Sequence, residues 1–421
     1  MFFRQKSVIK IGGGGGYVVF KYLNKLLVFI VVMLPVAGFI YLINAVGLPS
    51  YIKYYQTPTV FYEENYIFPE DAHITFPELK RNLIVIFVEG LETGYLPIEN
   101  GGAFTENLMP EVVYLAENNI NFSLNEGIGG PVQLSGAGWT IAGIVAYYSG
   151  LPLAVRFMDG NNYGSLGSKF LPGAYSIGDI LHDAGYRSYF ILGSDIAFGG
   201  RDKYFKTHRD TVIYDYNYFH DNNYIPNSYS VWWGIEDRKL YEFSKTKISE
   251  ISSEEPFFIT LLTVDTHPSD GYLDDEAEIV FDSQYKNVIR DMSRQLYAFV
   301  DWLKQQDFYE NTTIVILGDH LYMDWSFFPN TDGTTESYNR YPINIFINSL
   351  LNQSNVKNRI FSHFDMLPTI IESIGGIFDS EGLALGRSML NGHTLLEKYG
   401  EAEINRQLRS KSSLYDLFWR Q

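Results

Sequence analysis

The stretch NLIVIFVE, residues 82–89, indicates the fold class. Six consecutive apolar residues end in a carboxylate, and an unbroken apolar run of this length is typical of a strand buried on both faces of a parallel sheet. Four more runs of this kind follow: RSYFIL (187–192), PFFITLLTVD (256–265), TTIVILGD (312–319) and PINIFINS (342–349). The five runs predict five buried strands.

Helical patterns lie between these strands. They are SIGDILHDAG (176–185), QYKNVIRDMSRQLYAFVDWLKQQ (284–306) and HFDMLPTIIESIGG (363–376). The first begins with a serine cap and ends at glycine, and the last is stopped by glycines. Buried strands that alternate with helices predict an α/β sandwich around a mostly parallel central sheet.

Composition excludes several classes of protein. The chain has 421 residues, of which 46% are hydrophobic and 19% charged, so it is not a disordered chain. It has no cysteine, which excludes a disulfide scaffold and thiolate chemistry. The net charge is −17, and because the first 25 residues carry five basic and no acidic residues, the rest of the chain is even more acidic. A strongly acidic protein is repelled by phosphates, so we expect no nucleic-acid partner.

An uncharged apolar run extends from residue 26 to residue 52 and is long enough to cross a bilayer. A buried helix or a cleaved signal peptide could also carry such a run, but its length and the lack of a clear cleavage site favour an uncleaved span. The basic residues precede the run, so the positive-inside rule predicts a cytoplasmic N-terminus and a domain outside the cytoplasm.

These observations predict five segments. They are a cytoplasmic segment (1–25), a transmembrane helix (26–48), a juxtamembrane connector (49–79), an extracytoplasmic domain (80–390) and a C-terminal tail (391–421).

Potential metal ligands stand at two strand ends. Glu89 ends the first predicted strand, and Asp319 and His320 end the fourth. Ligands bind beyond the carboxyl ends of parallel strands, and this oxygen-rich set suits Mn²⁺ or Mg²⁺. Each residue alone is a weak signal, because a carboxylate at a strand end is usually a turn residue.

Thr140 has two interpretations. It lies in GAGWTIAGIVAYYSGLPL (136–153), between a glycine-rich approach and an apolar, helix-like stretch. A threonine at this place either caps the helix or is a nucleophile held where the helix N-terminus favours an anion.

The separated blocks resemble, in their order, the sulfatase/alkaline-phosphatase superfamily, in particular its branch of phosphoglycerol transferases and lipoteichoic acid synthases. FVEGLE (87–92) resembles the metal-ligand strand, and GWTIAGIVAYYSGLPL (138–153) resembles the nucleophile segment of the enzymes that decorate periplasmic glucans. GSDIAFGGRDKYF (193–205), TVDTHPSDGY (263–272), LGDH (317–320) and HFDMLPTII (363–371) follow in the family order.

The resemblance implies a role for each matching residue. Glu89, Thr140, Asp319 and His320 would bind one divalent ion, Mn²⁺ or alternatively Mg²⁺, and Thr140 would be the nucleophile. Arg201 and His267 would hold the phosphate and glycerol of the substrate, with His267 also moving protons, and Asp195 is a further candidate for a glycerol hydroxyl. Without the other blocks, a surface ion pair would explain Arg201 and a turn would explain His267.

The implied reaction transfers phosphoglycerol from phosphatidylglycerol to a glycan or glycolipid hydroxyl through a covalent intermediate on Thr140. A phosphoethanolamine transferase and a phosphodiesterase that uses water as acceptor remain alternatives, as does a non-catalytic binding protein on the same fold. A sulfatase activity is excluded, because the chain has no cysteine and no C/S-x-P-x-R pattern from which formylglycine is made. The glucan-modifying members have several spans and this chain shows one, so the resemblance leaves the acceptor open.

Overall fold

The computed structural model describes residues 15–45, 48–153, 168–252, 256–329, 339–352, 356–390 and 392–420. These residues form two compact units, one as far as Gln56 and one from Thr57 onward. Three of the basic residues behind the topology prediction, Arg4, Lys6 and Lys10, lie outside the described residues.

The first unit contains the helices α1 (Gly15–Ala45) and α2 (Leu48–Gln56). Within α1, Lys25–Ala45 has a mean hydropathy of 2.9, and none of this window is buried. By length and composition α1 can cross a membrane once, and the lack of buried residues in this window fits a membrane span better than a core helix.

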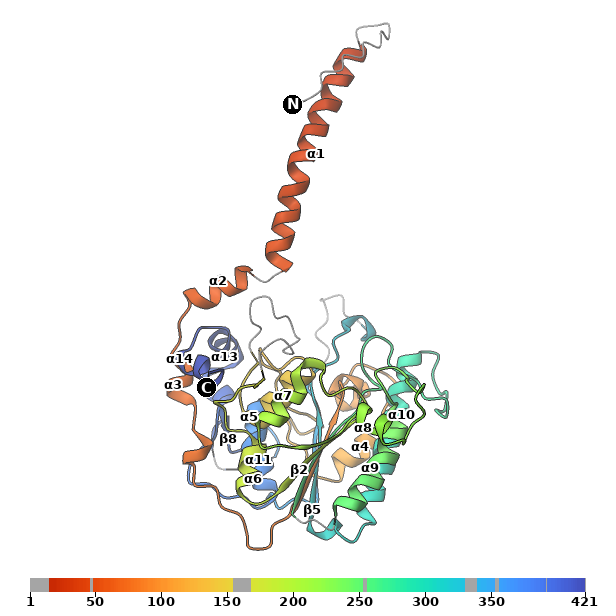
Figure 1. Ribbon diagram of the computed structural model, residues 1–421, viewed down its shortest axis with the longest axis vertical. Coiled ribbons are helices and arrows are strands. Elements are labelled where there is room, and N and C mark those ends of the chain that lie inside the picture. The colour runs from red at the N-terminus through yellow and green to blue at the C-terminus, as the bar shows by residue number, and fades with distance from the viewer. Residues whose placement is uncertain are drawn as a thin grey trace. The chain divides into compact units, whose positions relative to one another are not determined.

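The second unit is built on a six-stranded sheet (Figure 1). Its strands in chain order are β1 (Asn82–Val88), β2 (Arg187–Leu192), β3 (Val212–Tyr214), β4 (Phe257–Leu262), β5 (Thr312–Gly318) and β6 (Asn344–Ile347). Their order in the sheet is β3-β2-β4-β1-β5-β6, and all neighbours are parallel except β5 and β6. The predicted α/β class with a mostly parallel sheet is confirmed.

Two strand predictions need correction. The sequence did not predict β3, a half-buried edge strand, because its apolar run Val-Ile-Tyr has only three residues and is bounded by polar ones. The strand predicted for residues 256–265 ends at Leu262, because the backbone N–H groups of Val264 and Asp265 bond to the carboxylate of Asp237 instead of a neighbouring strand.

Helices cover both faces of the sheet, because alternate strand residues point to opposite sides. Leu83, Val85 and Phe87 of β1 enter one core, and Ile84, Ile86 and Val88 enter the other. The first core receives α5 (Thr140–Ser149), α6 (Ile177–Asp183), α7 (Arg201–Thr207) and α11 (Met366–Ser373). The second receives α4 (Pro110–Glu117), α8 (Tyr216–Asp221), α9 (Asp237–Ile251) and α10 (Gln284–Lys304).

Both ends of this unit pack into the first core. The short helix α3 (Phe61–Asn65) contributes Phe61 and Tyr62. The C-terminal helices α12 (Leu395–Tyr399), α13 (Glu401–Leu408) and α14 (Ser413–Phe418) contribute six buried apolar side chains: Leu395, Leu396, Ile404, Leu408, Tyr415 and Phe418. The C-terminal residues therefore form part of the core.

Candidate active site

The register of the two central strands brings two predicted ligands together. In the parallel pair β1–β5, Val88 is the partner of Gly318, so Glu89 and Asp319 leave the sheet side by side. The N–H of Gly90 donates to Asp319 Oδ1 across 2.8 Å. The carboxyl ends of neighbouring parallel strands thus place both carboxylates at one edge of the sheet.

Glu89, Asp319 and His320 form a buried cluster, and one potential ligand atom from each lies within 4.8 Å of the others. His320 Nε2 lies 3.2 Å from Glu89 Oε1 and 3.4 Å from Asp319 Oδ2. None of these three atoms has a hydrogen-bond partner of good geometry among the described residues. Buried polar atoms are rarely left unpaired, so this donor set fits a bound cation.

The three groups shift one another's pKa values. Burial and the neighbouring Glu89 raise the pKa of Asp319. Burial alone would lower the pKa of His320, but the carboxylates of Asp319 and Glu89 outweigh it and raise the pKa. Burial would likewise raise the pKa of Glu89, but His320 outweighs it and lowers the pKa. Concentrated negative charge is what a divalent cation would neutralise.

Thr140 is the first residue of α5, and its hydroxyl donates to Glu89 Oε2 across 3.1 Å. Trp139 occupies the cap position in an extended conformation, and no side chain caps the helix. The side chain of Thr140 therefore points to the cluster and does not cap α5. The N-terminus of α5 adds its positive dipole end beside the same carboxylate.

Gly143 lets α5 approach the cluster closely. A Cβ at this position would lie 2.1 Å from the carbonyl oxygen of Asp319. Any larger residue would push the helix away from β5, so the small residue of the TIAG sequence sets the distance between Thr140 and the strand ends.

Arg201 lies at the start of α7 and is buried. Its guanidinium donates to the carbonyl oxygens of Asp195 (2.7 Å) and Phe198 (3.0 Å) and to Ser194 Oγ (3.2 Å). Burial lowers its pKa to about 10, against the opposing effect of Glu89, so it keeps its positive charge at neutral pH near the cluster. The Asp195 side chain is exposed and accepts from the N–H of Ala197.

His267 lies in the loop after β4, next to β1 in the sheet. Its Nδ1 is 2.7 Å from the carbonyl oxygen of Pro268, so Nδ1 carries a hydrogen and Nε2 is the nitrogen that can exchange a proton. The charge of His267 also lowers the pKa of Glu89 after the larger effects of burial and His320. The sheet edge thus gathers the four predicted metal and nucleophile residues, with Arg201 at the start of α7 and His267 in the loop after β4 nearby.

Comparison with known proteins places this arrangement in a family. The sulfatase family model matches residues 81–377. The chain belongs to the sulfatase family. The similarity covers the whole sheet and every predicted site residue.

Two curated relatives are both named phosphoglycerol transferase I. The one from Xanthomonas campestris pv. campestris (strain B100) is 32% identical over 281 residues, which cover 64% of this chain and 38% of the relative. The one from Escherichia coli (strain 55989 / EAEC) is 29% identical over 361 residues, which cover 83% of this chain and 42% of the relative. This chain therefore spans about two fifths of the relatives it matches.

Two solved structures share the fold. A protein of the alkaline phosphatase superfamily from Vibrio parahaemolyticus has a TM-score of 0.57 at 20% identity, over 78% of this chain and 74% of that one. The lipoteichoic acid synthase LtaP from Listeria monocytogenes also has a TM-score of 0.57, at 16% identity, over 76% of this chain and 80% of that one. At these identities the likeness shows the fold.

Sequence patterns missed several residues around this sulfatase-family site. Thr266 Oγ1 donates to the carbonyl oxygen of Glu89 (2.5 Å), and Thr263 Oγ1 accepts from its N–H (3.2 Å). The ring of Trp233 lies 4.8 Å from the ring of His267. The only sequence signal for the two threonines was their position in the segment TVDTHPSDGY (263–272). No pattern in the sequence pointed to Trp233.

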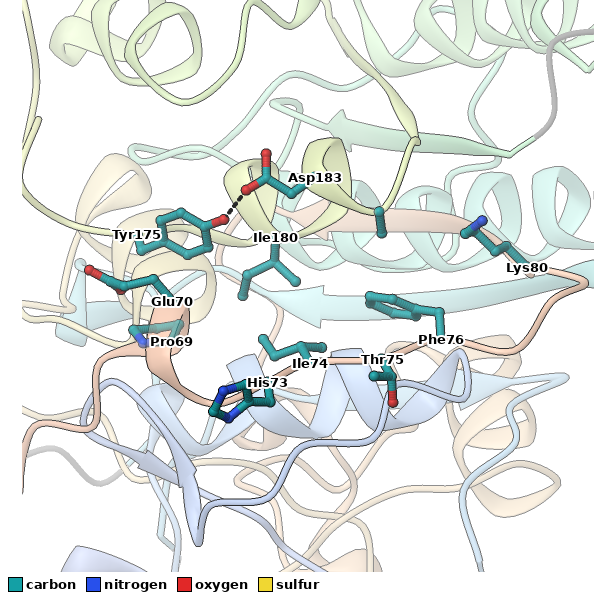
Figure 2. Close-up of a pocket in the computed structure, with 11 residues that line it drawn as sticks. Pro69, Glu70, His73, Ile74, Thr75, Phe76, Lys80, Tyr175, Ile180 and Asp183 are labelled. Carbon is teal, nitrogen blue, oxygen red and sulfur yellow. Dashed lines mark hydrogen bonds between the residues drawn. The ribbon is translucent and has the colours of Figure 1, made fainter.

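A cavity of about 570 Å³ lies elsewhere in the second unit, between residues 69–80 and α6 (Figure 2). Tyr175 donates a hydrogen bond to Asp183 at its edge. None of the predicted site residues lines this cavity, so it is separate from the cluster at the strand ends.

Proposed function

We propose that this protein is a membrane-anchored transferase that moves phosphoglycerol from phosphatidylglycerol to a hydroxyl of a glycan or glycolipid, through a covalent intermediate on Thr140. The names of the two curated relatives support the transferred group, and family membership supports the reaction class. The apolar helix α1 supports a membrane anchor and therefore a lipid donor.

One observation carries the proposal: the Thr140 hydroxyl donates to Glu89 Oε2 at the start of α5, beside three unpartnered ligand atoms. A hydroxyl placed there is oriented by its acceptor and faces the positive end of the helix dipole, where a phosphate is stabilised. A helix-capping threonine would bond to a backbone N–H of its own helix instead.

Glu89, Thr140, Asp319 and His320 are the residues that would hold the divalent ion. Mixed carboxylate and imidazole donors suit Mn²⁺, with Mg²⁺ as the alternative. When bound, the ion would supply positive charge that favours the deprotonated hydroxyl and neutralises phosphoryl oxygens.

The chain's own residues supply the remaining steps. Thr140 Oγ1 attacks phosphorus and releases its proton towards Glu89, its acceptor in the structure. The bond from phosphorus to diacylglycerol breaks, and His267 Nε2 gives the departing oxygen a proton. Arg201 offsets the negative charge that develops on the phosphoryl oxygens. In the second displacement an acceptor hydroxyl attacks the phosphorus of the phosphoglycerol on Thr140 and gives its proton to His267. The bond from phosphorus to Thr140 Oγ1 breaks, and Thr140 takes back the proton that it had released towards Glu89.

The position of the basic residues before the apolar run supports a catalytic unit outside the cytoplasm. We place the protein in the bacterial plasma membrane as a single-pass protein. Its catalytic unit would then meet lipid headgroups and glycans on the periplasmic or extracellular side.

Mass spectrometry of the Thr140 peptide tests the proposal. Full-length protein is incubated with phosphatidylglycerol whose headgroup glycerol is labelled, and the labelled phosphoglycerol is expected on Thr140 and absent from Thr140→Ala. An unmodified wild type that still consumes the lipid would show direct transfer to acceptor or water. Phosphoethanolamine on Thr140 after incubation with phosphatidylethanolamine, and no modification by phosphatidylglycerol, would establish the alternative donor. Consumption of neither lipid would favour a non-catalytic binding protein.

A further inference from the structure

Two tryptophans form the tip of a tight turn near the candidate active site. Val231 and Gly234 exchange both backbone hydrogen bonds, at 2.9 Å and 2.8 Å, and enclose Trp232 and Trp233 as the two central residues. Trp232 has a φ of 53° in the first central position. Turns of this kind favour glycine at a left-handed position, so a tryptophan there strains the backbone.

Packing does not explain this strain. The exposed fractions of Trp232 and Trp233 are 42% and 39%, so a large part of each indole faces solvent. Strained positions persist where the side chain serves a function that the surrounding fold can support. The strain at an exposed tryptophan therefore indicates that the indole contacts a ligand.

The turn is fixed to the substrate end of the sheet. The N–H of Ile235 donates to the carbonyl oxygen of Gly193, just beyond β2, across 3.0 Å. The Trp233 ring lies 4.8 Å from the His267 ring and 5.3 Å from the Phe198 ring. The Arg201 guanidinium carbon lies over the ring of Phe198, 5.7 Å from the centre of that ring. The exposed fraction of Phe198 is 55%. Phe198 and Trp233 thus adjoin both proposed substrate residues, and together with the exposed Trp232, which precedes Trp233 in the turn, they are called the aromatic rim.

We propose that this aromatic rim lies against the lipid surface while Arg201 and His267 bind the donor headgroup. This inference rests on the proposed function, because it assigns the rim to the lipid donor of that reaction. Tryptophan favours the boundary between headgroups and acyl chains, since its ring is apolar and its N–H can remain hydrated.

The observations favour a lipid surface over a stacked sugar as the occupant. The rim is made of three exposed aromatic side chains. The same chain carries α1, which is apolar enough to cross a bilayer. An anchored enzyme meets its lipid at high effective concentration, and a rim that enters the interface would orient the site towards it.

Trp232→Asn is the variant of choice, because asparagine tolerates a left-handed φ better than tryptophan. It is expected to keep or raise the melting temperature of the full-length protein, and Trp232→Gly is expected to do the same. A lower melting temperature for both variants would overturn the argument from strain and assign Trp232 a structural role.

Quenching of tryptophan fluorescence by brominated phosphatidylglycerol tests contact with lipid without any need for turnover. The protein has six tryptophans, and full-length protein is reconstituted into vesicles of the brominated lipid. Trp232→Asn is expected to lower the quenched fraction, and Trp302→Phe, a control on α10, is expected not to lower it. Equal quenching in wild type and Trp232→Asn would overturn the proposal.

Turnover of two donors separates the possible occupants. For Trp232→Asn, kcat/KM is expected to fall roughly tenfold for long-chain phosphatidylglycerol in vesicles and to stay within about twofold for monomeric dihexanoyl phosphatidylglycerol. An equal loss for both donors would overturn the proposal and place the indole on the headgroup. Unchanged lipid consumption with lost transfer to glycan would overturn it in favour of a sugar platform. If the wild type consumes neither donor, the proposed function fails, and the quenching result alone decides the lipid contact.

Discussion

The hydroxyl of Thr140 and the carboxylate of Glu89 are joined by a hydrogen bond of 3.1 Å, from the start of α5 to the residue after β1. The bond connects a helix of one core to a central strand end. It also separates the two interpretations of Thr140, because the hydroxyl donates to Glu89 and no side-chain hydrogen bond caps α5.

Substitutions of Thr140 should affect turnover far more than stability. Because Thr140 does not cap α5, Thr140→Asn should change the free energy of unfolding by less than the roughly 1 kcal/mol of a lost cap. Asparagine has no hydroxyl, so this variant should be inactive, whereas Thr140→Ser should keep part of the activity. Release of diacylglycerol from phosphatidylglycerol measures turnover; activity in Thr140→Asn would contradict a nucleophilic role.

Removal of metal should abolish activity, with Mn²⁺ restoring it best. The unpartnered atoms of Glu89, Asp319 and His320 motivate this expectation. Glu89→Gln and Asp319→Asn should each lower the metal content measured by inductively coupled plasma mass spectrometry, with the fold unchanged by circular dichroism. Glu99→Gln, at an exposed carboxylate, is the control. Full activity after exhaustive chelation would refute the metal requirement.

Gly143→Ala should destabilise the protein and reduce turnover. In a free helix, alanine is more favourable than glycine by about 1 kcal/mol. Here the added Cβ would lie 2.1 Å from the carbonyl oxygen of Asp319, so α5 must shift, at about 1–3 kcal/mol. Thermal unfolding and lipid turnover measure the two effects.

The control for this substitution is Gly127→Ala, where a Cβ would meet only the side-chain end of Asn125, at 3.3 Å. Higher stability with full activity in Gly143→Ala would show that α5 does not need this close approach.

Asp179→Asn should destabilise the protein in a pH-dependent way. Asp179 is buried and accepts from Ser176 N (2.9 Å) and His208 Nδ1 (2.7 Å). Burial would raise its pKa, but His208 outweighs burial and lowers it. A carboxylate with a lowered pKa stabilises the folded state above its unfolded pKa of about 4, and this contribution is lost as the pH falls through the folded pKa.

The difference in the free energy of unfolding between wild type and Asp179→Asn should therefore be about 2–3 kcal/mol at neutral pH and shrink below about pH 4. Denaturant unfolding at several pH values measures it. Asp282→Asn, at an exposed carboxylate, should show no such difference. A difference that is constant with pH would mean that the charge of Asp179 is not involved.

The C-terminus should lie outside the cytoplasm. An alkaline phosphatase reporter fused after Gln421 should be active, and a green fluorescent protein at the same place should be dark. Replacement of the five basic residues before Leu26 by glutamine should weaken this orientation, because the positive-inside rule attributes it to them. A fluorescent fusion and an inactive phosphatase fusion would reverse the topology.

The fold class and the two central strand ends followed from the sequence. Short apolar runs such as residues 82–89 and 312–319 are typical of strands buried on both faces, and parallel strands present their carboxyl ends at one edge. That reasoning placed Glu89 beside Asp319 and His320, and the pairing of Val88 with Gly318 brings them there. The local pattern had already left Thr140 as a cap or a nucleophile, and the family resemblance then added Arg201 and His267 to the same site.

Only the tertiary structure decided the features that depend on contacts between residues far apart in the sequence. Thr140 turns to Glu89 because β1 ends there, and β4 ends at Leu262 because Asp237 binds the next N–H groups. The turn that strains Trp232 closes through Val231 and Gly234 and is fixed by the bond from Ile235 to Gly193. Periodicity reports which face of an element is buried, whereas these features depend on which groups meet once the loops have closed, and no local pattern encodes that.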